Sequence, residues 1–538
     1  MTTSEYHEFV VIGAGVGGLQ QLTRLLQMGR DVLVIEANAG VGGTWFQNRY
    51  PGCRFDSESF TYGYSFSQEL LQEWDWSEMF AARPETLRYL EHVADRFELR
   101  PHIRFDTRVV AARYDEPRNR WRVETDAGDT VECRFLITAV GNLSAPTTPS
   151  LPGADTFEGA MFHTRDWPHD GLDLEGARVA VVGTGATGIQ VISAIAAQVD
   201  RLTVLQRRPN WAAPLNNRPI GADEMAEIKS RYDEIFARCD ATPGGFVHGP
   251  VEERFADADP AQRRALWERL YDAPGFGIWL GNYREVLMDP EANAELSAFV
   301  ADKIRQRVDD PATAEKLIPR DHGFGVQRLP LETGYYETYN RPNVELVDLS
   351  EEPLERATPR GVVVGGREIA LDVIVFATGF DAIVGALTRI DIVGRDGLAL
   401  RDAWRSGPRT AYGFAVPGFP NLLALTGPLS ASGATNFPRA IDTCVTWVSD
   451  LVQHMGDHGY TRIEATAEAT DAWVHDVAHS HERLLMRNAR SWFTGYNTNL
   501  RGTEKPRHLM YLGGAPRFRE RIDEVARHGY EGFSLERV

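Results

Sequence analysis

Two glycine-rich loops with the same spacing stand in the first half of the chain, and both have the pattern Gly-x-Gly-x-x-Gly. Their glycines are Gly13, Gly15 and Gly18 in the first loop and Gly183, Gly185 and Gly188 in the second. Glycines at these intervals let the backbone turn tightly and approach a pyrophosphate at a helix N-terminus. Each loop therefore predicts a dinucleotide site.

Charged residues after each loop distinguish the two predicted sites. Glu36 follows Gly18 by 18 residues, where a carboxylate accepts hydrogen bonds from an unphosphorylated ribose. Arg207 and Arg208 begin 19 residues after Gly188, where cations suit the 2′-phosphate of NADP and an acid would repel it. A solvated arginine pair at a strand end is the alternative interpretation. We favour the phosphate site because its distance from the loop fits the motif.

The elements expected around the loops are those that such sites require. Apolar strands are predicted at Phe9–Ile12 and Val32–Ile35 around the first loop, and at Val179–Val182 and 201–206 around the second. A helix is predicted directly after each loop. The weakly polar run Val179–Val199 is therefore interpreted as a strand, a loop and a helix, and not as a membrane span.

Two further segments complete this pattern. Residues 40–66 are rich in aromatic residues, glycine and arginine, and we expect them to form an active-site wall instead of a packed strand. Residues 371–381 read as an apolar strand followed by Ala-Thr-Gly-Phe. Together with one site for an unphosphorylated ribose and one for NADP, they describe a flavin enzyme that NADPH reduces.

Composition limits the other classes of function. The chain has 538 residues, 43% of them hydrophobic and 25% charged, as in ordinary globular proteins of several domains. Its net charge of −19 argues against nucleic-acid partners and anionic membranes. Four scattered cysteines form no C-x-x-C pair, so we expect a reducing cytoplasm, no disulfide framework and no metal site. No basic leader precedes the first strand, so a signal peptide is not expected.

Two longer motifs carry a resemblance to a known family. The first consists of Phe157, Gly159, His163, Trp167 and Pro168, and the second of Gly42, Gly43, Trp45, Tyr50, Pro51, Gly52 and Asp56. The chain resembles the Baeyer–Villiger monooxygenases, which are class B flavoprotein monooxygenases, and is most similar to their phenylacetone and steroid type. Residues 157–168 show no obvious helix or strand pattern, and their place between the flavin-binding part and the second glycine loop predicts an interdomain linker. The resemblance implies that this linker couples domain movement to NADP binding, and a surface loop is the alternative.

The resemblance implies the cofactors and the reaction. FAD and NADPH would be the cofactors, and a ketone and O2 the substrates. NADPH would reduce the flavin, O2 would add at its C4a carbon, and the resulting peroxide would attack the ketone to give an ester or lactone. Sulfoxidation would be a side activity.

Two catalytic residues carry over from the family. Arg328 matches the active-site arginine, a permanent cation beside two successive anions, and Asp56 matches the acid that holds it. A salt bridge between loops is the alternative for Arg328, and a turn or helix cap is the alternative for Asp56.

The expected cofactor contacts divide into two sets. The FAD set is Gly13, Gly15, Gly18, Glu36, Thr44, Trp45, Asp56, Tyr62, Val109 and Phe437. The NADP set is Thr184, Gly185, Gly188, Gln190, Arg207, Arg208, Gln327, Arg328 and Trp492. Trp492 matches a family tryptophan near the nicotinamide, and a packed core aromatic is the alternative. Gln327 replaces the usual phosphate-binding lysine and Arg208 a frequent threonine, so we infer a relocated positive charge and an NADPH preference of open strength.

The predicted fold class is α/β, with two Rossmann-like dinucleotide-binding domains and a helical insertion. The expected parts are FAD-binding 1–145 and 380–538, NADP-binding 146–221 and 323–379, and a helical subdomain 222–322. The protein is expected to be a monomer. Small residues in Gly427–Phe437, which resembles the family's substrate-side loop, suggest room for more than a small ring. Linear, cyclic, aryl and steroid ketones all remain open.

Three alternatives belong to other classes. An N- or S-oxygenating flavin monooxygenase is disfavoured by Trp167, Pro168 and Arg328. A disulfide reductase would need a C-x-x-C pair, which the chain lacks. A flavoprotein redox sensor without turnover is disfavoured by the two complete motifs.

Overall fold

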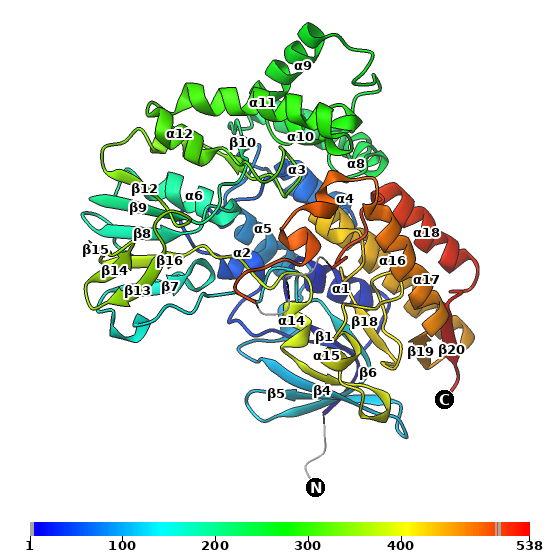
Figure 1. Cartoon of the computed structure of the whole chain (residues 1–538). Coiled ribbons are helices and arrows are strands. Elements are labelled where there is room, and N and C mark those ends of the chain that lie inside the picture. The colour runs from blue at the N-terminus through cyan, green and yellow to red at the C-terminus, as the bar shows by residue number, and fades with distance from the viewer. Residues whose placement is uncertain (1–4, 501–502, 504–506) are drawn as a thin grey trace.

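The computed structural model describes residues 5–500, 503 and 507–538. Its first large sheet contains the strand that leads into the first glycine loop (Figure 1). Its strand order is β17-β4-β5-β6-β1-β2-β3, with β18 paired to β6. The bounds are β1 (Glu5–Ile12), β2 (Val32–Ile35), β3 (Ile103–Arg104), β4 (Val109–Asp115), β5 (Arg120–Thr125), β6 (Thr130–Thr138), β17 (Asp391–Val393) and β18 (Leu422–Ala424). Strand β2 is buried along its whole length, as a parallel strand covered on both faces requires.

The second large sheet is wholly parallel and surrounds the second glycine loop. Its order is β12-β9-β8-β16-β7, with bounds β7 (Ala160–His163), β8 (Arg178–Val182), β9 (Arg201–Gln206), β12 (Val344–Asp348) and β16 (Val373–Phe376). An antiparallel sheet of β13 (Leu354–Thr358), β14 (Gly361–Val364) and β15 (Arg367–Ala370) lies beside it in Figure 1. The chain after the second glycine loop forms α6 (Ala186–Ile195).

Helices predominate between β10 (Ala213–Pro214) and β11 (Leu331–Glu332), at the top of Figure 1. They are α7 (Ala222–Ser230), α8 (Tyr232–Ala241), α9 (Pro260–Asp272), α10 (Gly277–Leu280), α11 (Pro290–Arg307) and α12 (Pro311–Leu317). Three of them begin with Asp-Pro, because Asp259, Asp289 and Asp310 accept backbone N–H bonds of the first turn and proline suits the first helical position.

The remaining helices cover the first sheet and connect the parts. They are α1 (Val16–Gln27), α2 (Thr44–Gln47), α3 (Ser59–Tyr62), α4 (Gln68–Glu73), α5 (Arg83–Arg96), α13 (Tyr335–Thr338), α14 (Gly385–Thr388), α15 (Leu400–Ala403), α16 (Phe437–His458), α17 (Ala467–His481) and α18 (Ala515–Arg527). The small pair β19 (Arg462–Ala465) and β20 (Phe533–Glu536) closes the C-terminal part. Helices α1 and α16 pack against each other, so the C-terminal chain returns to the first glycine loop.

The predicted fold class is confirmed, because both glycine loops join a parallel strand to a helix in separate sheets. The predicted bounds of β2 and β9 are those of the structure. The start of the predicted helical subdomain is helical, and it divides at Arg231 into α7 and α8.

One expectation was wrong. Residues 160–163, expected to lie outside helices and strands, form edge strand β7 beside β16. Its side chains are largely half-buried, so no clear alternation marks it in the sequence.

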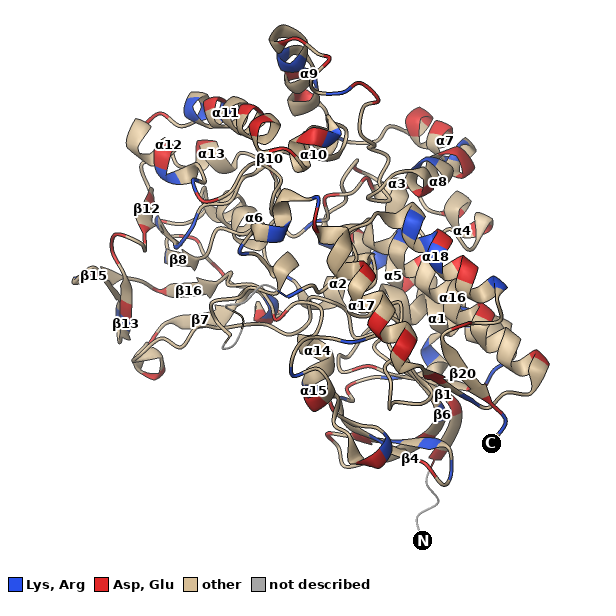
Figure 2. Ribbon diagram, turned by 45° about the vertical axis from the view of Figure 1, so that its right-hand side comes forward, with Lys and Arg blue, Asp and Glu red and all other residues tan. Residues whose placement is uncertain are grey.

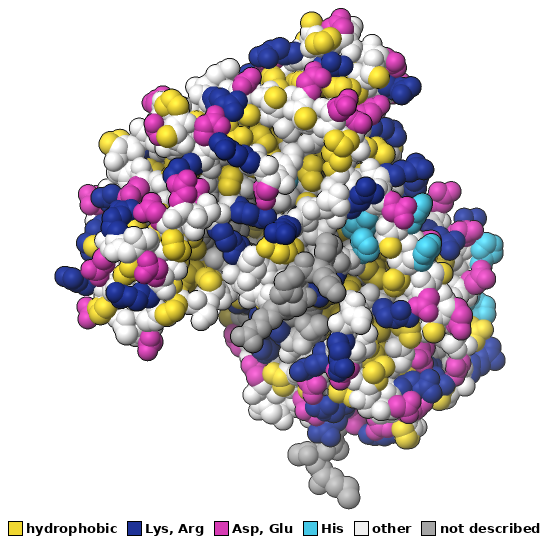
Figure 3. Space-filling model, in the orientation of Figure 1, with side chains coloured by type: hydrophobic (Ala, Val, Ile, Leu, Met, Phe, Trp, Pro, Cys, Tyr) yellow, Lys and Arg dark blue, Asp and Glu magenta, His cyan; other side chains and the backbone are white. Residues whose placement is uncertain are grey.

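The described residues also bear on membranes, metals and surface charge. None of their helices combines the length and the apolar character that crossing a membrane requires. Their four cysteines are buried and unpaired, and no cluster of three or more His, Cys, Asp or Glu has a metal-binding arrangement among them. Acidic and basic residues alternate along the ribbon in Figure 2 and are interspersed on the face seen in Figure 3, so the acidic excess is not one continuous patch on that face.

Candidate active site

A cavity of about 760 Å³, which we call the central cavity, lies where the two large sheets and the helical region meet. The predicted site residues that line it are Gly13, Gly15, Glu36, Thr44, Trp45, Asp56, Tyr62, Val109, Gln190, Arg328, Phe437 and Trp492. Segments distant in sequence thus meet around one space. Gly18, Thr184, Gly185, Gly188, Arg207, Arg208 and Gln327 are not among the residues that line it.

The first glycine loop has the geometry of a phosphate-binding turn. A Cβ at Gly18 would lie 1.8 Å from the Gly13 carbonyl oxygen, so only glycine allows α1 to start this close to β1. No described side chain caps the N-terminus of α1 at Gly15, and its first turn contains no acidic residue. These free N–H groups and the positive end of the helix fit the pyrophosphate of FAD.

Glu36 stands beside this loop at the end of β2. Its carboxylate accepts hydrogen bonds from the Ala14 N–H at 2.7 Å and the Asn38 N–H at 2.8 Å, and it is buried. Burial raises the pKa of Glu36, and these backbone N–H bonds oppose the rise. The acid is therefore held in one orientation at the cavity wall, where a ribose of FAD would meet it.

The second glycine loop repeats the geometry. A Cβ at Gly188 would lie 2.2 Å from the Gly183 oxygen, whereas one at Gly185 would meet no described atom within 4 Å. Gly185 therefore leaves open space at the uncapped start of α6, as the close approach of a nucleotide pyrophosphate requires. The hydroxyl of Thr184 donates to the Arg208 carbonyl at 2.9 Å and fixes the loop to the end of β9.

The two arginines after β9 differ in their surroundings. Arg208 donates to Asp321 at 3.0 Å and to the Arg490 carbonyl at 2.8 Å. Arg207 is exposed and forms no ion pair with a described residue. Arg207 is thus the freer cation for a 2′-phosphate, and Arg208 ties the loop to the segment that carries Trp492.

Helix α6 also touches the wall of the first site. Tyr50 donates to the Gln190 side chain at 3.0 Å, and Gln190 donates in turn to the Arg54 carbonyl at 3.0 Å. A Cβ at Gly52 would come within 2.7 Å of the Gln190 carbonyl oxygen. These contacts explain the Tyr-Pro-Gly of the second motif, because they fix the two nucleotide units against each other.

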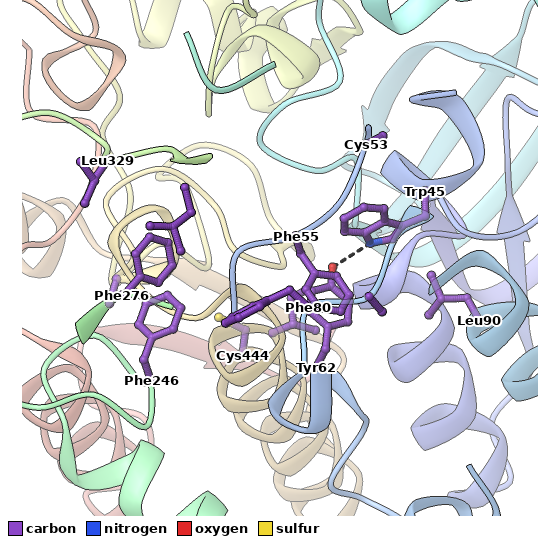
Figure 4. Packing of buried hydrophobic residues seen from close by; sticks show 14 of the residues in the cluster. Trp45, Cys53, Phe55, Tyr62, Phe80, Leu90, Phe246, Phe276, Leu329 and Cys444 are labelled. Carbon is purple, nitrogen blue, oxygen red and sulfur yellow. Dashed lines mark hydrogen bonds between the residues drawn. The ribbon is translucent and has the colours of Figure 1, made fainter. Parts of the chain in front are cut away.

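Residues 40–66 form the wall that the sequence predicts, with short helices and turns and only an isolated strand bridge at Arg54. The Trp45 indole donates to the Tyr62 hydroxyl at 2.7 Å, and Phe55 stacks on Tyr62 with ring centroids 4.4 Å apart (Figure 4). Burial raises the pKa of Tyr62, so its hydroxyl stays protonated at neutral pH. The aromatic cluster gives one rigid side of the central cavity.

Asp56 and Arg328 meet across the cavity although 272 residues separate them. Arg328 Nη1 donates to Asp56 Oδ2 at 2.5 Å and to the Leu329 carbonyl at 2.7 Å. Asp56 is 7% exposed and the Arg328 side chain 31% exposed, so the carboxylate is the anchored member and the guanidinium faces the cavity. Donors directed to an open space can stabilise an anion that forms there.

Part of the motif at 157–168 belongs to the second sheet, because His163 is the last residue of β7. His163 Nε2 donates to the Gly379 carbonyl at 3.1 Å, while its Nδ1 accepts the Arg165 N–H at 3.1 Å. Arg165 then donates to the Gln47 side chain at 3.0 Å and lines the cavity. The histidine thus directs an arginine from the second nucleotide unit toward α2 of the first.

Several cavity residues were missed by the sequence analysis. Arg165 lies inside a motif that was recognised, so its position was the available signal. Phe246, Phe276 and Trp279 line the cavity from the helical region, and Phe276 lies 5.3 Å from the Arg328 guanidinium carbon. They stand in loops and a short helix without periodicity, so no pattern distinguished them from core aromatics.

Comparison with known proteins assigns the family. A protein-family model described as "Pyridine nucleotide-disulphide oxidoreductase" matches residues 10–238. The chain is 45% identical to 2-oxo-Δ³-4,5,5-trimethylcyclopentenylacetyl-CoA monooxygenase of Pseudomonas putida and 43% identical to acetone monooxygenase (methyl acetate-forming) of Gordonia, with 98% of each chain covered in both cases. The chain belongs to the Baeyer–Villiger monooxygenase family.

A solved structure of this family supports the cofactor assignment. The structure of OTEMO in complex with FAD and NADP superposes with a TM-score of 0.96 at 44% identity, over 99% of this chain and all of that one. The present chain is an FAD-dependent monooxygenase that uses NADP. Relatives include a phenazine N-monooxygenase of Lysobacter antibioticus at 37% identity over 98% of this chain, so the family also contains N-oxygenating members.

Proposed function

We propose that this chain converts ketones to esters or lactones with NADPH and O2 in the central cavity. The observation that carries the proposal is the Asp56–Arg328 pair, which places a fixed cation at the wall of the central cavity. FAD, when bound, accepts hydride from NADPH and activates O2. The remaining steps are those that this chain's own side chains perform.

Arg328 stabilises negative charge on the reacting oxygen atoms. Its guanidinium is a cation with several N–H donors, and Asp56 holds it by a 2.5 Å hydrogen bond while other N–H groups remain available to the cavity. Preorganised donors of this kind stabilise the anion of a tetrahedral intermediate without reorganisation. The aromatic residues Phe246, Phe276 and Trp279 limit water on the same side.

The nucleotide sites are proposed residue by residue. Gly13, Gly15 and Glu36 hold FAD, with Trp45, Tyr62 and Val109 against it, while Gly18 allows the close turn. The purified protein should be yellow, with one FAD per chain. A colourless protein that takes up no added FAD would contradict the whole proposal.

The NADP site extends from the second glycine loop to the C-terminal region. Gly185 and Gly188 shape the loop, and Arg207 binds the 2′-phosphate. Gln190 and Trp492 lie on the cavity, where the nicotinamide would meet the flavin.

The substrate is proposed as a ketone larger than a small ring. Ser432, Gly433, Ala434 and Thr435, within the predicted substrate-side loop, line the cavity with small side chains. The relatives' names span acetone and a substituted cyclopentenyl acyl-CoA, so size alone does not select one class. Product analysis by mass spectrometry with linear, cyclic, aryl and steroid ketones, and with an aromatic N-heterocycle, is the direct test. N-oxide formation without any ester would favour the N-oxygenating alternative.

Domain limits, assembly and location complete the proposal. We place FAD-binding residues at 1–145 and 380–538, NADP-binding residues at 146–221 and 323–379, and a helical subdomain at 222–322. Strands β17 and β18 pair with the first sheet and β16 with the second, which supports these limits. The chain is proposed to act as a cytoplasmic monomer, and its unpaired described cysteines agree with a reducing compartment. Light scattering on the purified holoenzyme tests the monomer.

A further inference from the structure

A second buried acid lies two residues beyond Asp56 and has its own partner. Glu58 is 4% exposed, and its Oε1 accepts a hydrogen bond from His248 Nε2 at 2.6 Å. The other oxygen, Oε2, is buried without a hydrogen-bond partner among the described residues. A carboxyl group so enclosed depends on its single partner for orientation. None of the catalytic steps above uses this pair.

The pair joins the segment after Asp56 to two loops of the helical region. His248 lies on the loop that follows α8, two residues after Phe246. The backbone of Gly275 lies directly against the pair, because a Cβ there would be 2.7 Å from Glu58 Oε1 and 3.0 Å from His248 Nε2. Gly275 immediately precedes Phe276. Both aromatic loops therefore rest on the same hydrogen bond.

The rings on these two loops meet at the central cavity. Phe246 and Phe276 pack edge to face with centroids 5.2 Å apart, as Figure 4 shows, and both line the cavity. The Arg328 guanidinium carbon lies 5.3 Å from the Phe276 centroid. Asp56 fixes Arg328 from one side of this contact, and Glu58 fixes the opposite aromatic loops through His248.

The first of these loops has a second, independent attachment. The Asn436 N–H donates to the Gly244 carbonyl at 2.7 Å, which fixes the start of the loop next to the substrate-side segment. His248 fixes its other end. The Phe246 carbonyl also accepts a hydrogen bond from Thr242 Oγ1 at 2.7 Å, and the Val247 carbonyl accepts one from Arg238 Nε. Loss of the His248 contact therefore removes the restraint that the loop shares with Gly275, while these other bonds keep the loop folded.

From these contacts we propose that Glu58 and His248 are a positioning pair that holds Phe246 and Phe276 against Arg328 and so controls ketone binding and the coupling of NADPH oxidation to ester formation. The inference rests on the proposed function. The pair acts through the aromatic side chains and touches no reacting atom. Loss of the pair should leave hydride transfer from NADPH unchanged. The contacts of Glu58 and His248 lie on the side of the cavity that holds Arg328, and none of them is with the second glycine loop.

The test compares His248→Leu, which has no N–H donor, with His248→Gln, which keeps a donor of similar reach. The matched control is His479→Leu, since His479 pairs with Glu482 at 2.9 Å on the exposed surface of α17. FAD content, flavin reduction by NADPH without O2, ketone KM and ester formed per NADPH are measured on each holoenzyme.

We expect His248→Leu to raise the ketone KM by about tenfold, or ~1.4 kcal/mol in binding free energy, with flavin reduction unchanged. Ester per NADPH should fall, with hydrogen peroxide making up the difference, and His248→Gln should restore much of both. The control should match the wild type. If His248→Leu does not fold, His248→Asn against His248→Gln gives the same comparison, since the shorter amide does not reach Glu58.

Two results would overturn the inference. One is an unchanged ketone KM and coupling in the variant without a donor. The other is an equal loss of FAD content and reduction rate, which would make the pair a general structural contact. Wild-type enzyme that NADPH reduces but that forms no ester from any ketone would instead refute the proposed function, and this inference with it.

Discussion

Replacing Arg328 should separate ester formation from flavin reduction. In Arg328→Ala, FAD binding and reduction by NADPH should persist, because Arg328 belongs to neither glycine loop and is expected to act on the anions formed after O2 has reacted. Ester formation should fall by about 10²–10³-fold, since loss of one preorganised donor to an oxyanion costs ~2.7–4 kcal/mol. The NADPH that is still oxidised should yield an equivalent amount of hydrogen peroxide in place of ester.

The structure also predicts an asymmetry between the two partners. Loss of Arg328 leaves Asp56, which is 7% exposed, as a buried carboxylate without its cation, and this should cost about 3–5 kcal/mol of stability. Asp56→Asn leaves Arg328, 31% exposed and still bonded to the Leu329 carbonyl, at a cost of about 1 kcal/mol or less. Both variants should lose ester formation, but only the first should melt at a much lower temperature.

The double variant Asp56→Asn with Arg328→Met distinguishes stability from catalysis. Replacing the ion pair with neutral groups should recover most of the lost stability, whereas the ester yield should remain low. The assay combines thermal unfolding of the holoenzyme with stopped-flow reduction and product analysis, using a ketone that the wild type accepts. Near-normal ester yield from Arg328→Ala, or recovery of ester in the double variant, would remove Arg328 from the catalytic assignment.

Three further changes test other parts of the structure. Arg207→Ala should raise the KM for NADPH by about 10- to 150-fold with little effect on NADH, the range for a lost charge-assisted contact of ~1.5–3 kcal/mol; equal wild-type use of both coenzymes would contradict it. Arg307→Met should lower the free energy of unfolding by about 3–5 kcal/mol, because the fully buried Glu332 side chain loses its 2.7 Å partner. The control Arg305→Met removes an exposed ion pair and should cost under about 1 kcal/mol. Equal denaturant midpoints for the two variants would refute this. Burial lowers the pKa of His481 from 6.5 to about 4, so the unfolded chain binds the proton at a higher pH than the folded chain does. Up to about 3 kcal/mol of stability should therefore be lost as the pH falls from 6.5 to 4. His481→Asn should make stability, measured by urea titration, depend less on pH in this range, and an unchanged pH dependence would exclude the prediction.

The parts that the sequence predicted best are those with local physical requirements. Strand β2 consists of four consecutive buried apolar residues directly before Glu36, and β9 ends directly before Arg207. In both cases the end of the strand and the charged residue that follows it mark the same boundary. Gly18 and Gly188 are required by contacts with their own loops, within five residues of chain. Such signals need no knowledge of distant segments.

Contacts between distant segments were predictable only through the family resemblance or not at all. Asp56 and Arg328 lie 272 positions apart, and nothing in either neighbourhood specifies the other. Strand β7 was missed because an edge strand with half-buried side chains lacks a clear pattern. Phe246 and Phe276 resemble core aromatics in sequence, and only the folded chain shows them together at the cavity.

Gln327 stands where the family resemblance implies a phosphate-binding lysine. The sequence suggested that the positive charge had moved to Arg207 and Arg208. Arg208, however, is bound to Asp321 at 3.0 Å and to the Arg490 carbonyl, so much of its charge is already compensated. The Gln327 amide nitrogen is buried without a partner among the described residues, and it offers a hydrogen-bond donor but no charge. We therefore expect coenzyme discrimination to depend mainly on Arg207, while Arg208 links the loop after β9 to the segment that carries Trp492.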